Sequence, residues 1–69
     1  SGKSALDEAS SDLVRRGLAT WSEDAAKRPV MIVRGQANLL DEAALGDIER
    51  VRANFVHGFR KLEVEITDF

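Results

Sequence analysis

The first four residues, Ser-Gly-Lys-Ser, are the part of the sequence most suggestive of chemistry, because a phosphate-binding P-loop also ends in Gly-Lys-Ser. Such a loop needs an earlier glycine and a preceding strand, so that successive backbone amides surround the phosphate groups. Residues 1–4 supply neither feature. We therefore interpret them as a terminal segment and not as a nucleotide site.

His57 is the single histidine of the chain, and the chain contains no cysteine. Catalysis by this imidazole would require a partner that orients it, and a metal site would require further ligands. Six of the twelve acidic residues stand in sequential pairs, which are Asp7-Glu8, Glu23-Asp24 and Asp41-Glu42. Neighbours in a helix point in different directions, so these pairs do not form acid-base couples. We expect no enzyme activity, no cofactor and no metal ion; the alternative of a nucleotide-binding or catalytic protein built on Lys3 and His57 predicts stabilisation by a ligand.

Composition places the chain among small single domains. Its 69 residues form one domain at most, and a domain of this size buries only about 60% of the surface of its unfolded chain. The formal net charge is -2 with acids and bases interspersed, which is not the basic stripe of a nucleic-acid surface. No apolar run approaches the roughly 20 residues of a membrane span, and no secretory signal is recognisable. We expect a cytoplasmic protein without membrane contacts that gains stability from another chain or from the rest of a longer protein.

The first part of the sequence predicts an amphipathic helix over residues 4–16. Its apolar residues recur at helical spacing, and Ser4 begins a stretch that resembles a capping box. Gly17 is expected to end the helix in the left-handed conformation. The chain would then bring Leu18 back against Leu13 in a Schellman cap.

Two short apolar runs then predict an antiparallel β-hairpin. Residues 18–22 favour a short strand, and the β-favouring residues 30–33 favour a second one. The residues between them have the composition of a loop of about eight residues that ends at Pro29. Trp21 is expected to cover one face of the hairpin.

The corner Ile-Val-Arg-Gly-Gln-Ala-Asn-Leu-Leu, residues 32–40, changes from strand character to helix character. The strand is expected to end at Arg34, and Gly35 is expected to permit a tight change of direction. Asn38 is a competent N-cap for a short helix over residues 39–45. We expect replacement of Gly35 by valine to impair folding.

After Gly46, Asp47 is expected to cap a second, longer helix, whose apolar residues recur every three or four positions on one face. The alternating tail predicts a third strand at residues 62–67. The predicted fold class is therefore α+β, with an amphipathic helix, an antiparallel β-hairpin, a short helix, a longer helix and a third strand at the C-terminus.

The apolar residues of the second half could serve either as core or as a dimer interface, and the sequence does not separate these roles. The residues concerned are Leu39, Leu40, Ile48, Val51, Phe55 and Phe59. An alternative is a stand-alone protein-protein interaction module that docks a partner helix on the face with Phe55 and Phe59.

Three ordered blocks of the sequence resemble the HrcA family of bacterial heat-inducible transcription repressors. The blocks read ALDEASSDLVRRGLATWS, RPVMIVRGQANLL and DIERVR, and the resemblance extends over about residues 4–55. Its most specific part is the corner, with Val33, Gly35, Asn38, Leu39 and Leu40. After residue 55 the sequence departs from the family pattern, so the resemblance implies nothing for residues 56–69.

The resemblance implies that the chain shares a function with the rest of a longer repressor. Members of the family have a winged-helix domain for DNA, a GAF-like domain and a dimerising domain inserted into the latter, and the matching blocks fall in the inserted domain. As dimers they bind an inverted-repeat operator and repress chaperone operons, with a chaperonin assisting the active state. Residues 1–69 would then be a dimerisation segment and a homodimer. Operator DNA would be bound only through a winged-helix domain absent from this chain, and a chaperonin would be a partner of the parent protein.

Overall fold

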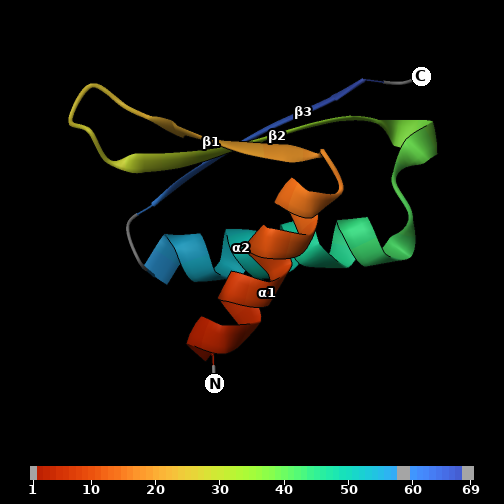
Figure 1. Ribbon diagram of the computed structural model, residues 1–69, viewed down its shortest axis with the longest axis horizontal. Coiled ribbons are helices and arrows are strands. Elements are labelled where there is room, and N and C mark those ends of the chain that lie inside the picture. Colours follow the sequence, from red (N-terminus) through yellow and green to blue (C-terminus); the bar gives the residue numbers. More distant parts are fainter. Residues whose placement is uncertain (1, 58–59, 68–69) are drawn as a thin grey trace.

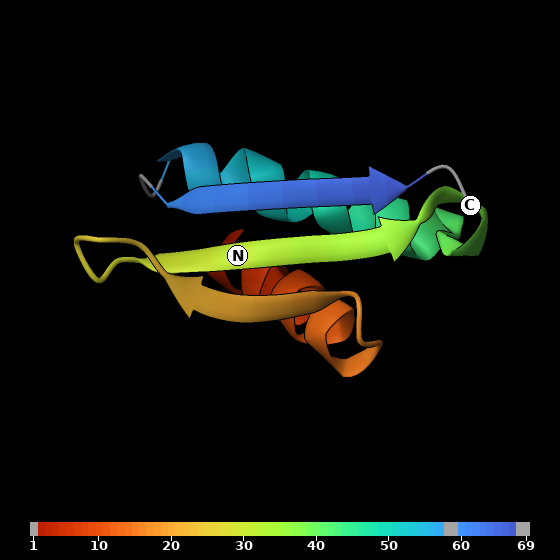
Figure 2. The same cartoon turned by 90° about the horizontal axis from the view of Figure 1, so that it is seen from above.

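The chain forms a three-stranded sheet with both helices packed against one of its faces (Figures 1 and 2). This computed structural model describes residues 2–57 and 60–67, with the side chains of residues 8–55 and 60–67. In chain order the elements are α1 (Gly2–Arg15), β1 (Ala19–Glu23), β2 (Pro29–Gln36), the 3-10 turn η1 (Ala37–Leu39), α2 (Glu42–His57) and β3 (Lys61–Thr67). The predicted α+β class is confirmed. Among the described residues, no helix is long and apolar enough to cross a membrane.

The strands lie in the order β1-β2-β3, with β2 in the centre. The predicted antiparallel hairpin is confirmed, and Trp21 of β1 lies opposite Met31 of β2. The predicted third strand is also confirmed, and it pairs with β2 in parallel, with Met31 beside Leu62. Parallel pairing requires a crossover connection, which α2 supplies by carrying the chain back beneath the sheet.

The core lies between the central strand and the helices. Met31 and Val33 are fully buried, because alternate residues of β2 point toward the helical layer. Leu13 from α1 and Phe55 from α2 pack against them and are no more than 2% exposed. Trp21 stacks on Phe55 with ring centroids 6.0 Å apart, although 47% of Trp21 stays exposed. The hairpin therefore joins the core through its edge strand as well as through β2.

Of the two predictions made for the ends of α1, one is wrong and the other is confirmed. The predicted cap at Ser4 is wrong, because α1 begins at Gly2 and Ser4 lies within the helix. The predicted Schellman cap is confirmed, since Gly17 has a φ of +74°. The N–H of Leu18 donates to the carbonyl of Leu13 over 2.9 Å, which is the defining bond of this cap. The cap turns the chain from α1 directly into β1.

Asp24 organises the turn between β1 and β2. Its carboxylate accepts hydrogen bonds of 2.9 Å from the backbone N–H groups of Ala26 and Arg28, and it pairs with the Arg28 guanidinium at 3.0 Å. The bond from the Arg28 N–H is the main reason why the pKa of Asp24 lies below its ordinary value of 3.8. The connection occupies residues 24–28 and is shorter than predicted, because β1 continues to Glu23.

A single helix, α2, replaces the two helices predicted for the second half. Asn38 lies inside η1 and is not a helix cap. The N-cap role belongs to Asp41, whose carboxylate accepts the N–H of Ala44 at 2.8 Å. From there α2 continues without a break through Gly46 and Asp47. A glycine inside a helix costs only about 1 kcal/mol, which the burial of the apolar face of α2 outweighs.

Replacement of Gly17 by alanine is expected to lower the free energy of unfolding by about 1 kcal/mol, because a side chain is strained at a positive φ. No atom lies within 4 Å of the position that its Cβ would take, so the loss reports on the backbone alone. Gly46→Ala is the matched control, expected to raise this free energy by roughly 0.5–1 kcal/mol in a helix interior. Urea unfolding followed by circular dichroism measures both, and effects of the same sign would contradict these assignments.

Candidate interaction surface

Arg16 and Asp41 join the end of α1 to the beginning of α2. Two guanidinium nitrogens of Arg16 donate to the two carboxylate oxygens of Asp41 over 3.0 and 2.8 Å, which is a bidentate pair. The same carboxylate caps α2 through the N–H of Ala44. The hydrogen bonds from Arg16 are the main reason why the pKa of Asp41 lies below 3.8. The two helix ends are thus held together beside the corner that follows β2.

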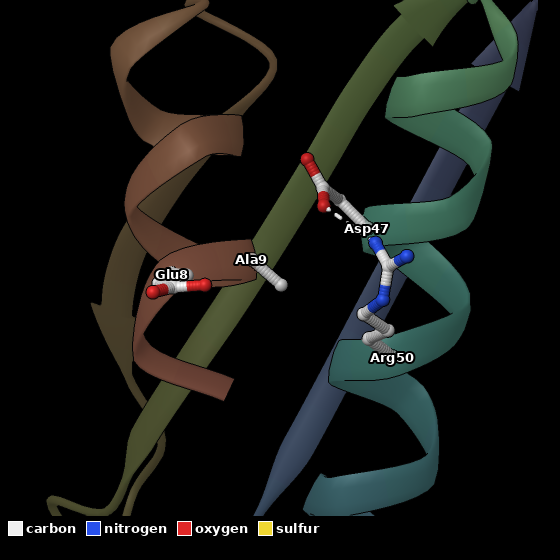
Figure 3. Close-up of a pocket in the computed structure, with 4 residues that line it drawn as sticks. All are labelled: Glu8, Ala9, Asp47 and Arg50. Carbon is white, nitrogen blue, oxygen red and sulfur yellow. Dashed lines mark hydrogen bonds and ion pairs between the residues drawn. The ribbon is translucent and has the colours of Figure 1, made fainter. Parts of the chain in front are cut away.

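A pocket of about 300 Å³ lies between the helices, with Glu8 and Ala9 of α1 facing Asp47 and Arg50 of α2 (Figure 3). Asp47 is 8% exposed and accepts a hydrogen bond from Arg50 at 3.1 Å. Burial raises the pKa of Asp47, and its hydrogen bond with Asp12 raises it further. The same bond is the main cause of the lowered pKa of Asp12. Across the contact between the helices, the ionised form is therefore favoured at Asp12 and disfavoured at Asp47.

Lys3 and His57, the basis of the catalytic alternative, belong to α1 and α2. Their side chains lie outside the described part of the structure, so that alternative stays a prediction. Within the described part, no group of three side chains could hold a metal ion.

Arginine side chains pair extensively with carboxylates of the chain itself. The described residues form six ion pairs, with N–O distances of 2.6–3.1 Å: Arg15–Asp12, Arg16–Asp41, Arg28–Asp24, Arg34–Glu65, Arg50–Asp47 and Arg52–Glu49. The guanidinium of Arg60 lies over the ring of Phe55, 5.9 Å from its centroid. Because DNA binding depends on cations that can neutralise phosphates, this internal pairing disfavours a nucleic-acid surface on the described residues.

The residues predicted as either core or interface divide into distinct groups. Three are in the core and at most 3% exposed: Ile48, Val51 and Phe55. Leu39 is 65% exposed and Leu40 is half-buried. Phe59 lies outside the described residues. The alternative of a partner helix docked on Phe55 is wrong for that residue, because its own core encloses it.

The sequence predicted a turn at Gly35, but the chain does not turn there. β2 continues past it to Gln36, and Gly35 pairs with Ile66 of β3 without a positive φ. Gly35 lies close to Leu40, whose side chain would have to shift slightly to admit a Cβ. A Cβ would lie 3.2 Å from Cδ2 of Leu40 and 3.5 Å from Cδ2 of Leu18. The expected harm from a valine at this position therefore arises from crowding and not from a turn.

Two hollows meet beside Leu18 at the end of the sheet. The larger, of about 380 Å³, has a lining that includes Leu18, Gly35, Leu39 and Thr67. The smaller, of about 120 Å³, extends along the sheet beside Ile32. Leu18 and Arg34 line both hollows, so they form one continuous depressed surface.

Sequence reasoning did not identify Arg34 and Glu65 as parts of this surface. They are neighbours in the β2–β3 register and form an ion pair at 3.0 Å, with side chains 65% and 61% exposed. The alternating tail predicted the strand that carries Glu65, but not its neighbour in the sheet. Only the pairing of strands distant in sequence places it beside Arg34.

Comparison with known proteins finds similar segments in proteins described as "Heat-inducible transcription repressor HrcA". The protein of Novosphingobium aromaticivorans is 76% identical over 51 residues, covering 74% of this chain and 14% of the relative. That of Erythrobacter litoralis is 75% identical over 52 residues, covering 75% and 15%. That of Brucella suis is 48% identical over 62 residues, covering 87% and 16%. The chain thus spans about a seventh of the length of these relatives. No protein-family model matches the chain, and no solved structure matches it significantly.

Replacement of Asp41 by alanine is expected to lower the urea midpoint of unfolding, because α2 loses its N-cap and Arg16 loses its partner. Asp41→Asn keeps an oxygen that can accept the N–H of Ala44, so it should lower the midpoint less. Arg16→Gln is the matched control, because it removes the ion pair and leaves the cap in place. Equal midpoints for the alanine and asparagine variants would show that the cap contributes nothing.

Replacement of Asp47 by asparagine is expected to change how stability depends on pH. The pKa of Asp47 is raised by folding, so its stabilising contribution is complete below 3.8 and is lost as the pH rises through the folded pKa. Asparagine stays neutral, and the variant should therefore gain stability relative to the wild type as the pH is raised from below 3.8 through the raised pKa of Asp47. Urea unfolding of both proteins across this range measures the difference. If the two proteins showed the same dependence of stability on pH, the raised pKa of Asp47 would be contradicted.

Proposed function

The chain belongs to the HrcA family of heat-inducible transcription repressors, and we propose that it is the segment that joins two copies of such a repressor. In this proposal the full-length protein negatively regulates heat-shock (chaperone) operons by binding an inverted-repeat operator. The DNA-binding surface belongs to a winged-helix domain outside this chain. The names of the relatives support repression and heat induction, and the dimer and the operator are the proposed additions.

The observation that carries the dimerisation role is a leucine left exposed on a chain whose arginines are largely paired. Leu39 is 65% exposed at the rim of a hollow, whereas six arginines form ion pairs within the chain. Exposed apolar surface beside a depression is typical of protein-protein contact, and paired cations are not typical of phosphate binding. We therefore assign the segment a protein partner, and within a repressor the simplest partner is a second copy.

Dimerisation would contribute to operator binding through effective concentration. Once one DNA-binding domain occupies its half-site, a tethered second domain is held near the other half-site, so the second contact becomes intramolecular. A twofold dimer also matches the symmetry of an inverted repeat. The Arg16–Asp41 contact would help here, because a segment with fixed helix ends transmits a defined separation to the domains attached to it.

The remaining partners follow from the parent protein in this proposal. A repressor acts on the chromosome, which in a bacterium lies in the cytoplasm. A chaperonin would assist the full-length protein, and no catalytic role is assigned to residues 1–69, whose relatives are named as repressors.

Sedimentation equilibrium of the 69-residue chain at high micromolar concentration tests the proposal. We expect a species of twice the 7.6 kDa monomer mass, with a dissociation that depends on concentration. Passage over heparin at low salt is the control, and we expect no salt-dependent retention. A strictly monomeric chain would contradict the proposed dimerisation. Salt-dependent retention on heparin would indicate that this segment itself binds nucleic acid.

A further inference from the structure

Among the described residues, no helix lies on the outer face of the sheet. Both helices lie on the opposite face, where Met31 and Val33 enter the core (Figures 1 and 2). Residues that alternate with these two point outward, and they include the half-buried Ile32 and the exposed Arg34. The two hollows beside Leu18 therefore open on the part of the outer face, around Ile32 and Arg34, that the described elements leave accessible.

From this surface we propose that the second copy of the chain docks on the outer face of the sheet, with Leu39 of each copy inserted in the larger hollow of the other. The inference rests on the proposed dimerisation and names the surface that performs it. The docking surface consists of Leu18, Ile32, Arg34, Gly35, Leu39 and Glu65.

The shape of the corner supports a second copy as the occupant. Leu39 is the most exposed of the large apolar residues in the described chain, and it stands at the rim of a hollow of about 380 Å³. A twofold contact is self-complementary, so a protrusion and a depression on the same patch can fill each other in both directions.

The charges at the rim are also self-complementary. Arg34 and Glu65 lie side by side at 3.0 Å, and both side chains are more than 60% exposed. A twofold axis beside this pair would bring the arginine of one copy toward the glutamate of the other, so that each charge would gain a second partner of opposite sign. A partner of uniformly basic or acidic character would instead meet one like charge at this rim.

The area needed for a stable dimer explains why the surface must include the sheet. Standard interfaces bury about 800 Å² from each partner, which is about a sixth of the 4832 Å² accessible surface of this chain. The corner alone is too small for that. The smaller hollow continues the contact along β1 and β2 past Ile32, which supplies further apolar area on the same face.

The first test compares two exposed leucines in sedimentation equilibrium of the 69-residue chain. Leu39→Ser should raise the dissociation constant of the dimer about tenfold or more, as expected for an anchor residue. Leu45→Ser is the matched control, because Leu45 is 46% exposed on α2, in the opposite layer, and its replacement should leave the constant unchanged. Circular dichroism checks that both variants fold.

The outcomes separate the two proposals. A monomeric wild type overturns the proposed dimerisation and this inference with it. A dimeric wild type whose dissociation constant is unaffected by Leu39→Ser overturns this inference alone, and the hollow would then belong to another part of the repressor.

Disulfide trapping gives a second reading that does not depend on the stability of Leu39→Ser. The chain contains no cysteine, so a single Leu39→Cys or Leu45→Cys replacement leaves one reactive thiol per copy. Mild oxidation should link Leu39→Cys chains into covalent dimers much faster than Leu45→Cys chains, because a twofold contact brings the two corners together. Equal rates for both variants would overturn the proposed docking surface.

Discussion

The bidentate contact between Arg16 and Asp41 links the end of α1 to the beginning of α2, at the junction from which β1 leaves. Arg16 follows the last residue of α1, and Asp41 caps the first turn of α2, so one ion pair holds two helix ends that are distant in sequence. The Schellman cap at Gly17 sends the chain from the same point into β1. β2 then brings the chain back toward this junction, and η1 connects β2 to α2.

The second consequence is that the sheet has a covered face and an uncovered one. A domain of this size has few apolar side chains to bury, and its two helices cover the face with Met31 and Val33. The opposite face keeps Ile32 and the ion pair between Arg34 and Glu65. In the proposed repressor this face is where the second copy completes the burial that one copy cannot complete alone.

Sequence patterns predicted the elements that depend on neighbouring residues. The helix end at Gly17, the hairpin and the third strand follow from local chemistry and from alternation, and the structure confirms each of them. Gly46 was misleading because its local cost of about 1 kcal/mol is small beside the burial of a long apolar helix face. The role of Gly35 was misinterpreted because a glycine can occur both at a turn and at a site of close packing, and the sequence does not distinguish the two.

Features that depend on pairing across the chain were not accessible from local patterns. Asn38 and Asp41 are both good caps, and the partner of Asp41, Arg16, lies 25 residues away. The division of the apolar set into a buried Phe55 and an exposed Leu39 depends on which elements cover each residue. The surface formed by Arg34 and Glu65 likewise depends on the parallel pairing of β2 and β3, which are distant in sequence.

The central claim is that two copies of this chain meet through the corner and the outer face of the sheet. Its most direct test is an isotope-filtered nuclear Overhauser experiment on a mixture of labelled and unlabelled chains, which detects contacts between copies only. We predict contacts between the methyl groups of Leu39 in one copy and those of Leu18 in the other. Contacts between copies that involve only residues of α1 and α2 would contradict it.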